Sequence, residues 1–269
     1  FCVHQRKNSI DTVARRLQSL KSLFTYLSQI AEDENYYPYL KRNVMAKIEI
    51  ERQKRTQTER AESIQSKILQ EDEIEKFRIF VASDYGELIK NNKRAYNYYI
   101  QNRERDLALI SLILGSGLRV SEAVSLDIDM IDFNNCYVLI NRKGGKKDKV
   151  VFSDTALQDL IVYRDIRESR YKADKTEKAF FLTLPTNNKR VTRMSKSTAQ
   201  KMVDKYAEAF GKPFLSIHKL RHTFATQHYK KNKDLITLQR QLGHSNTNTT
   251  AIYTHVFDDT LKKSVDKAD

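Results

Sequence analysis

The sequence contains few of the residues that make tight turns, and this scarcity limits the fold. Its 269 residues include seven glycines and three prolines. An all-β architecture with many short turns needs more of both, so we expect another fold class. Neither GxGxxG nor GxxxxGK[ST] occurs in the chain, which argues against a Rossmann or P-loop nucleotide site.

Cysteines and long apolar runs are also scarce. The two cysteines, Cys2 and Cys136, are too few for a disulfide framework and favour a reducing, intracellular setting. The longest apolar run, 107–114 (LALISLIL), is too short to span a bilayer, so we expect no membrane partner. The chain begins at Phe1 without a Met or a signal peptide, and we expect it to be a fragment of a longer protein.

Positive charge is what the sequence has in excess. It carries 48 Lys and Arg against 34 Asp and Glu, a net charge of +14. Apolar residues make up 40% of the chain, enough for a packed core. A folded protein with this charge suits a polyanion, and nucleic acid is the simplest candidate.

Apolar spacing predicts a small helical module at the start of the chain. Candidate N-cap residues at 8, 9 and 11 precede an amphipathic stripe, and a second helical segment begins at Pro38. The members of the first stripe are Val13, Leu17, Leu20, Leu23, Phe24 and Leu27, and those of the second are Leu40, Val44, Met45 and Ile48. The polar stretch 49–62 is either a solvated helix end or a linker. We favour a linker, because a new apolar pattern begins at Ile68.

The sequence therefore predicts three parts: a small helical module at 1–55, a linker at 56–67 and a larger domain at 68–269. From Ile68 to Leu118 the pattern is helical, with a break at 91–92. Short strands are expected at 128–133, 136–142 and 149–153, the last two joined as a hairpin through Gly144 and Gly145. Helices follow, with breaks at 185–190 and 211–213. The fold class is mainly α with a small antiparallel β-sheet (α+β), in two domains.

Histidines cluster late in the chain, which invites three interpretations: a metal site, a phosphate site or chance. Five of the six follow residue 217. His218 and His222 stand at i, i+4, as in a zincin helix, but the zincin Glu is absent and Lys219 and Arg221 would repel a dication. His218 and Arg221 at i, i+3 share a helix face and suit phosphate oxygens. An isolated HxxR pair, however, is usually structural.

Three motifs in fixed order give the HxxR pair its significance. SGLRVSEAVSLD is followed by HKLRHTFAT and then by LGHSNTNTTAIYTHV. Together they resemble the tyrosine recombinases, in particular the Xer recombinases that resolve chromosome dimers. The resemblance covers residues 68–269 well and residues 1–60 only in general character.

The resemblance implies a catalytic set, placed by motif position. It comprises Arg119, Lys143, His218, Arg221, His244 and Tyr253, with Glu122 supporting the active-site arginine. Lys143 is assigned from its hairpin, where Lys146, Lys147 and Lys149 lie close by. His222 is assigned a packing role.

The implied chemistry agrees with the residue types. A phosphodiester is an anion, so two Arg and two His can stabilise attack on it without metal or cofactor. Tyr is a poor nucleophile until it loses its proton, which Arg neighbours and a His base favour. The covalent phosphotyrosine conserves the bond energy, so no ATP is needed, and a Lys can protonate the leaving alkoxide.

The expected partner is double-stranded DNA carrying an inverted-repeat recombination site, clamped between the two modules. The resemblance also makes 1–55 the DNA-binding module and 68–269 the catalytic domain. It implies a homotetramer on two duplexes, a possible DNA translocase activator and a cytoplasmic location at the nucleoid. In the family a tail such as 256–269 docks on a neighbouring subunit, and packing in cis or fraying are the alternatives. The family's first module has about four helices, whereas two are expected here.

Other functions share these motifs. An integrase or transposase of a mobile element uses the same chemistry on different DNA, and a type IB topoisomerase relaxes supercoils with it. A DNA-binding module that has lost catalysis is a further alternative, although the motif set is intact.

Overall fold

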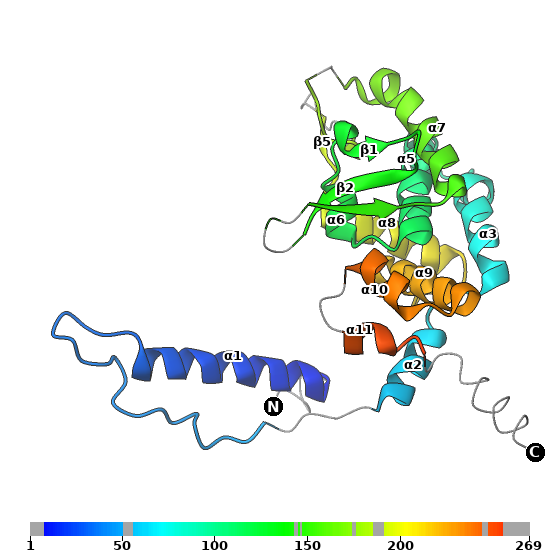
Figure 1. Cartoon of the computed structure of the whole chain (residues 1–269). Coiled ribbons are helices and arrows are strands. Elements are labelled where there is room, and N and C mark those ends of the chain that lie inside the picture. The colour runs from blue at the N-terminus through cyan, green and yellow to red at the C-terminus, as the bar shows by residue number, and fades with distance from the viewer. Residues whose placement is uncertain are drawn as a thin grey trace, which may run out of the picture. The chain divides into compact units, whose positions relative to one another are not determined.

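The computed structural model divides into two compact units, Phe1–Thr56 and Gln57–Asp269, shown in Figure 1. It describes residues 8–50, 56–142, 145, 147–173, 176–184, 191–243 and 247–254, the last range without the side chains of 247 and 248. Several expectations lie outside these residues: the thiol of Cys2, residues 143, 144 and 146 of the hairpin turn, the break at 185–190 and the tail at 256–269. The division into functional modules stays a prediction.

The described residues of the first unit contain one helix, α1 (Ile10–Gln29). It begins where expected, because the Ser9 side chain accepts a hydrogen bond from the Thr12 backbone N–H at 3.3 Å. The expected second helix is wrong: the described residues from 38 to 50 form turns. Asn43 Oδ1 accepts from the Met45 N–H at 3.0 Å, and Lys21 Nζ donates to the Ile48 carbonyl at 2.8 Å. Side chains thus bind backbone groups that a helix would have paired internally.

The second unit begins with α2 (Gln57–Gln65), which occupies most of the segment expected as a linker. Ala61 and Ile64 on this helix, three residues apart and therefore on one face, are buried against the protein. The polar composition of 49–62 did not predict this helix, because only two of its side chains, Ala61 and Ile64, are buried.

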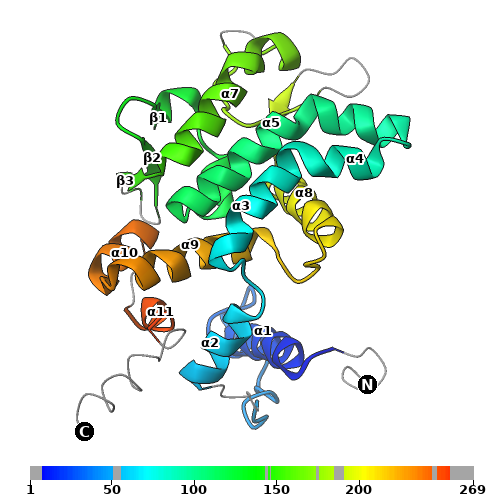
Figure 2. The ribbon, with the colours of Figure 1, turned by 90° about the vertical axis from the view of Figure 1, so that its right-hand side faces the viewer.

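A long helix, α5 (Lys93–Ser116), forms the centre of the second unit (Figure 2). Asn92 caps its start, as the predicted break indicates, and Gly117 ends it with φ +71°. The apolar run 107–114 lies mostly at zero exposure inside the protein. Among the described helices, none is both long enough and apolar enough to cross a membrane.

Helices from both sides pack on α5. They are α3 (Glu71–Ile79), a π-helical turn η1 (Phe80–Asp84), α4 (Tyr85–Ile89), α6 (Val120–Val124), α7 (Asp154–Tyr171) and α9 (Ile217–Asn232). The helix α8 (Lys196–Ala209) packs on α6 and α9. A break follows α8 as predicted, with Gly211 at φ +83°.

The described strands form two small antiparallel sheets. The first orders β1 (Ile131–Asp132), β2 (Tyr137–Asn141) and β3 (Lys147–Val151), and the second pairs β4 (Leu182–Thr183) with β5 (Thr192–Arg193). The predicted hairpin is confirmed, with Val138 opposite Val150. Residues 128–130, expected in a strand, instead make a 3₁₀ turn, η2 (Ile128–Met130). The mainly α fold with a small antiparallel sheet is confirmed.

The last described helices are α10 (Leu235–Leu242) and α11 (Thr247–Ala251). The Asp234 carboxylate caps α10 by accepting from the N–H groups of residues 236 and 237 at 2.9 and 3.0 Å. Gly243 ends α10 with φ +61°. Since α10 packs on both α9 and α11, the second and third motifs meet at one end of the unit (Figure 2).

Candidate active site

Arg119 stands at the start of α6, directly after the turn that ends α5. Its backbone N–H and its Nη1 both donate to Glu122, each at 2.8 Å. One carboxylate therefore satisfies the helix start and holds the guanidinium. About a third of the Arg119 side chain stays exposed (37%), so it can still reach a ligand. Glu122 makes the contact expected of a supporting residue.

Arg221 lies deeper, on α9. Its Nη1 donates to the Gly117 carbonyl at 2.6 Å and its Nη2 to the Leu242 carbonyl at 2.9 Å. Glu122 Oε2 lies 3.9 Å from Nη1. Burial and then the neighbouring Arg119 lower the pKa of Arg221 below its usual value. Two cationic groups thus share one carboxylate, which leaves net positive charge for an anion.

His218 lies one helical turn before Arg221. Partial burial lowers the pKa of His218, and nearby cations led by Arg221 lower it further. The imidazole is therefore neutral at pH 7, able to donate one hydrogen bond and accept another. Such a ring suits a phosphate oxygen beside two guanidinium groups.

Tyr253 is buried in the turn that follows α11, with 2% of its surface exposed. Its hydroxyl lies 2.9 Å from His222 Nδ1. Burial raises the pKa of Tyr253 to about 12, while the charge of Arg221 acts in the opposite direction. The hydroxyl is therefore neutral at rest and hydrogen-bonded to a group that can take its proton.

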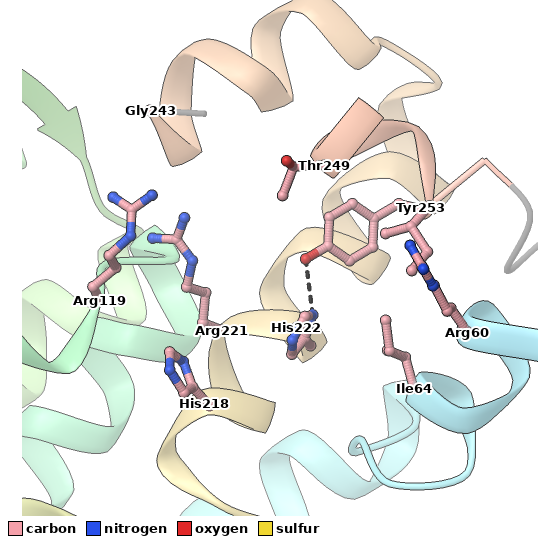
Figure 3. A pocket seen from close by; sticks show the side chains of 10 residues that line it. Arg60, Ile64, Arg119, His218, Arg221, His222, Gly243, Thr249 and Tyr253 are labelled. Atoms are coloured by element: carbon pink, nitrogen blue, oxygen red, sulfur yellow. Dashed lines mark hydrogen bonds between the residues drawn. The ribbon is translucent and has the colours of Figure 1, made fainter. Parts of the chain in front are cut away.

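These side chains enclose one pocket of about 580 Å³. Figure 3 shows Arg119, Arg221 and His218 grouped on one side, with the Tyr253 hydroxyl directed toward His222 across from them. The full lining is Arg60, Ile64, Arg119, His218, Arg221, His222, Gly243, Thr249, Ile252 and Tyr253. All four expected catalytic residues that the structure describes thus lie together.

The other two expected catalytic residues, Lys143 and His244, lie outside the described residues. Their chain neighbours are described. Gly243 lines the pocket, and Arg142 Nη2 donates to the Gln241 carbonyl at 3.1 Å. The β2–β3 hairpin therefore contacts the end of α10.

Sequence reasoning missed three lining residues. His222 was assigned to packing, although its position four residues after His218 already places it on the same face of α9. Arg60 falls in the segment expected as a linker, and Thr249 lies within the third motif but was given no role. Only the fold of α11 shows that His222 meets Tyr253.

Metal ligands do not gather at this pocket. Across the described ranges, no three His, Cys, Asp or Glu residues group as ligands would. His218 and His222 both line the pocket, but so do Arg119 and Arg221. This charge favours an anion over a dication.

Comparison with known proteins identifies the family. The Phage integrase family model matches residues 68–260. Tyrosine recombinase XerS of Streptococcus sanguinis (strain SK36) is 42% identical over 263 residues, which cover 96% of this chain and 71% of that protein. XerS of Lactococcus lactis subsp. cremoris (strain SK11) is 39% identical over 258 residues, with the same coverage.

Solved structures share the fold. The XerH site-specific recombinase bound to difH substrate, in a pre-cleavage complex, is 25% identical with a TM-score of 0.67, covering 98% of this chain and 67% of that one. The Tn1549 transposon integrase in complex with transposon right end DNA is 18% identical with a TM-score of 0.62, covering 98% and 81%. The chain therefore belongs to the phage integrase family and is a tyrosine recombinase, an enzyme of site-specific DNA recombination.

Proposed function

We propose that the chain recombines DNA at an inverted-repeat site through Tyr253 and so resolves chromosome dimers. One observation carries the catalytic assignment: the Tyr253 hydroxyl shares a pocket with Arg119, Arg221 and His218. Three donors for phosphate oxygens and one nucleophile are the minimum for phosphoryl transfer to a tyrosine.

The proposed cleavage step breaks one P–O bond and forms another. Arg119 and Arg221 bind the non-bridging oxygens of the scissile phosphate. The Tyr253 oxygen attacks phosphorus while His222, 2.9 Å away, takes the hydroxyl proton. The P–O5′ bond breaks, which leaves a 3′-phosphotyrosyl link. The leaving 5′-oxygen takes a proton from Lys143.

His218 and His244 complete the proposed set. His218 is neutral and faces Arg221, so it can donate to a phosphate oxygen without adding repulsion to the arginine pair. His244 follows Gly243, which lines the pocket, and we assign it a second donor role. No step requires ATP, because the bond energy is kept in the phosphotyrosine. No step requires a metal ion, because the arginines supply the positive charge at the phosphate.

The nucleophile is tested by trapping on a nicked suicide substrate. The wild-type chain should form a covalent DNA adduct that survives denaturing electrophoresis. Tyr253→Phe should form none, whereas Tyr229→Phe, a half-buried tyrosine of the same apolar cluster, should match wild type. An adduct in the Tyr253→Phe protein would show that another residue attacks.

The cellular role rests on the comparisons. Relatives named XerS are about 40% identical over 96% of the chain, whereas the transposon integrase is 18% identical. We assign the chain to chromosome dimer resolution, as a homotetramer on two duplexes in the cytoplasm, with a DNA translocase as activator. Deleting the gene should leave unresolved dimers that the wild-type gene removes and the Tyr253→Phe gene does not. Normal chromosome segregation in the deletion strain would favour the mobile-element alternative.

A further inference from the structure

Arg142 joins two parts of the site that are far apart in sequence. It follows the last residue of β2, and its Nε lies 2.7 Å from Asp148 Oδ2 on β3. Its Nη2 donates to the Gln241 carbonyl at 3.1 Å. Only 13% of the side chain is exposed. One guanidinium therefore connects both strands of the hairpin to the C-terminus of α10.

Gly243 provides the space for this guanidinium. A Cβ at Gly243 would lie 0.7 Å from Nη1 of Arg142 and 1.8 Å from its Cζ. Any side chain there would expel Arg142. The positive φ of +61° disfavours other residues as well. The end of α10 is thus shaped around an arginine of the hairpin.

The end of α10 is also fixed from two other directions. Gln241 Nε2 donates to the Ser116 carbonyl at 2.9 Å and to the Val151 carbonyl at 2.6 Å. Arg221 donates to the next carbonyl, that of Leu242, at 2.9 Å. Arg142 therefore attaches the hairpin to a segment that already holds the phosphate-binding Arg221.

We propose that Arg142 is a positioning residue that fixes the hairpin on α10 so that Lys143 can act on the scissile phosphate. This inference rests on the proposed function. Lys143 follows Arg142 directly, and His244 follows Gly243. Consecutive Cα atoms are about 3.8 Å apart. Holding Arg142 against Gly243 therefore limits the distance between the residues that follow them in the chain, Lys143 and His244.

The test uses the leaving group. In 5′-bridging phosphorothiolate DNA, sulfur replaces the leaving oxygen, and a thiol with a pKa near 8.5 departs without a proton donor. Loss of a general acid costs about 10²-fold or more with ordinary DNA. Arg142→Ala should show a loss of that order with ordinary DNA. It should recover most of the loss with the thiolate substrate, as Lys143→Ala does.

Three controls make this result specific. DNA binding by Arg142→Ala should stay within about twofold of wild type. Arg142→Lys keeps the charge but cannot reach two partners at once, so it should fall between Ala and wild type. Arg164→Ala removes an arginine of α7 that lies over the Phe133 ring beside the same sheet, and should cleave normally. Thermal unfolding of each variant reports whether the protein is folded.

The outcomes separate the inference from the function it rests on. If Lys143→Ala recovers with the thiolate and Arg142→Ala does not, Arg142 does not position the acid and the inference is wrong. If neither recovers, Lys143 is not the acid and both assignments fall. If wild type forms no adduct through Tyr253 on either substrate, the proposed function itself is wrong. If Arg142→Ala is unfolded, Arg142→Lys takes its place and should show its smaller loss with ordinary DNA and the same recovery with the thiolate substrate.

Discussion

The contact between His222 and Tyr253 predicts how cleavage depends on pH. With a pKa of about 12, only about one Tyr253 in 10⁵ is ionised at pH 7. Ionising the hydroxyl at that pH therefore costs about 7 kcal/mol. A rate that depended on preformed phenolate would rise tenfold with each pH unit. His222, 2.9 Å from the hydroxyl, removes this dependence if it accepts the proton during attack. The wild-type rate should therefore not rise tenfold per pH unit between pH 7 and pH 9.

His222→Gln tests this reasoning. Glutamine can still donate to the Tyr253 oxygen but cannot accept a proton, so packing is kept and the base is lost. Single-turnover cleavage at pH 7 should fall by about 10²- to 10⁴-fold. The rate should then rise about tenfold per pH unit up to pH 9, because the variant depends on the phenolate. The difference in rate between His222→Gln and wild type should therefore shrink as the pH rises.

The matched control is His228→Gln, a change of the same kind on the same helix. His228 is absent from the pocket lining, and its variant should keep the wild-type profile. If His222→Gln is slow at every pH with an unchanged slope, His222 only packs against Tyr253, and the base lies elsewhere.

Three further predictions concern the residues around the pocket. Glu122→Gln weakens the hydrogen bonds that hold the Arg119 guanidinium. In single-turnover assays its cleavage rate should fall about tenfold or more, while gel-shift assays should show DNA binding near wild type. Gly243→Ala should destabilise the protein by several kcal/mol in a denaturant titration, whereas Gly211→Ala, also at positive φ but with open space around the new Cβ, should cost about 1 kcal/mol. The lowered pKa of His218 stabilises the fold above the pKa of an unfolded histidine and less as pH falls, so His218→Gln should lose less stability than wild type between pH 7 and pH 5.

Some of this site follows from sequence because its residues stand in short motifs. Arg119 and Glu122 are three residues apart, as are His218 and Arg221, and helical periodicity alone places each pair on one face. The hairpin follows equally from its alternating strands and its two glycines. Local rules suffice for these pairs because the partners are close in the chain.

The contacts that local rules miss join distant segments. His222 and Tyr253 are 31 residues apart, and Arg142 and Gln241 are 99 apart. Neither pair leaves a periodic signal. The absent helix after Pro38 has a different cause, since the Asn43 side chain offers the backbone a turn that apolar spacing does not reveal.

In the site without DNA, the positive charges of Arg119 and Arg221 are only partly compensated. Arg119 and Arg221 repel one another, and each lowers its free energy through the single carboxylate of Glu122. A phosphate between them would bring a second negative group within reach of both. Binding energy is thereby gained at the scissile position. A phosphate also adds negative charge near Tyr253, which disfavours the phenolate further. In the proposed mechanism the proton therefore leaves as the Tyr253–phosphorus bond forms, so the contact with His222 should have a large effect on the rate.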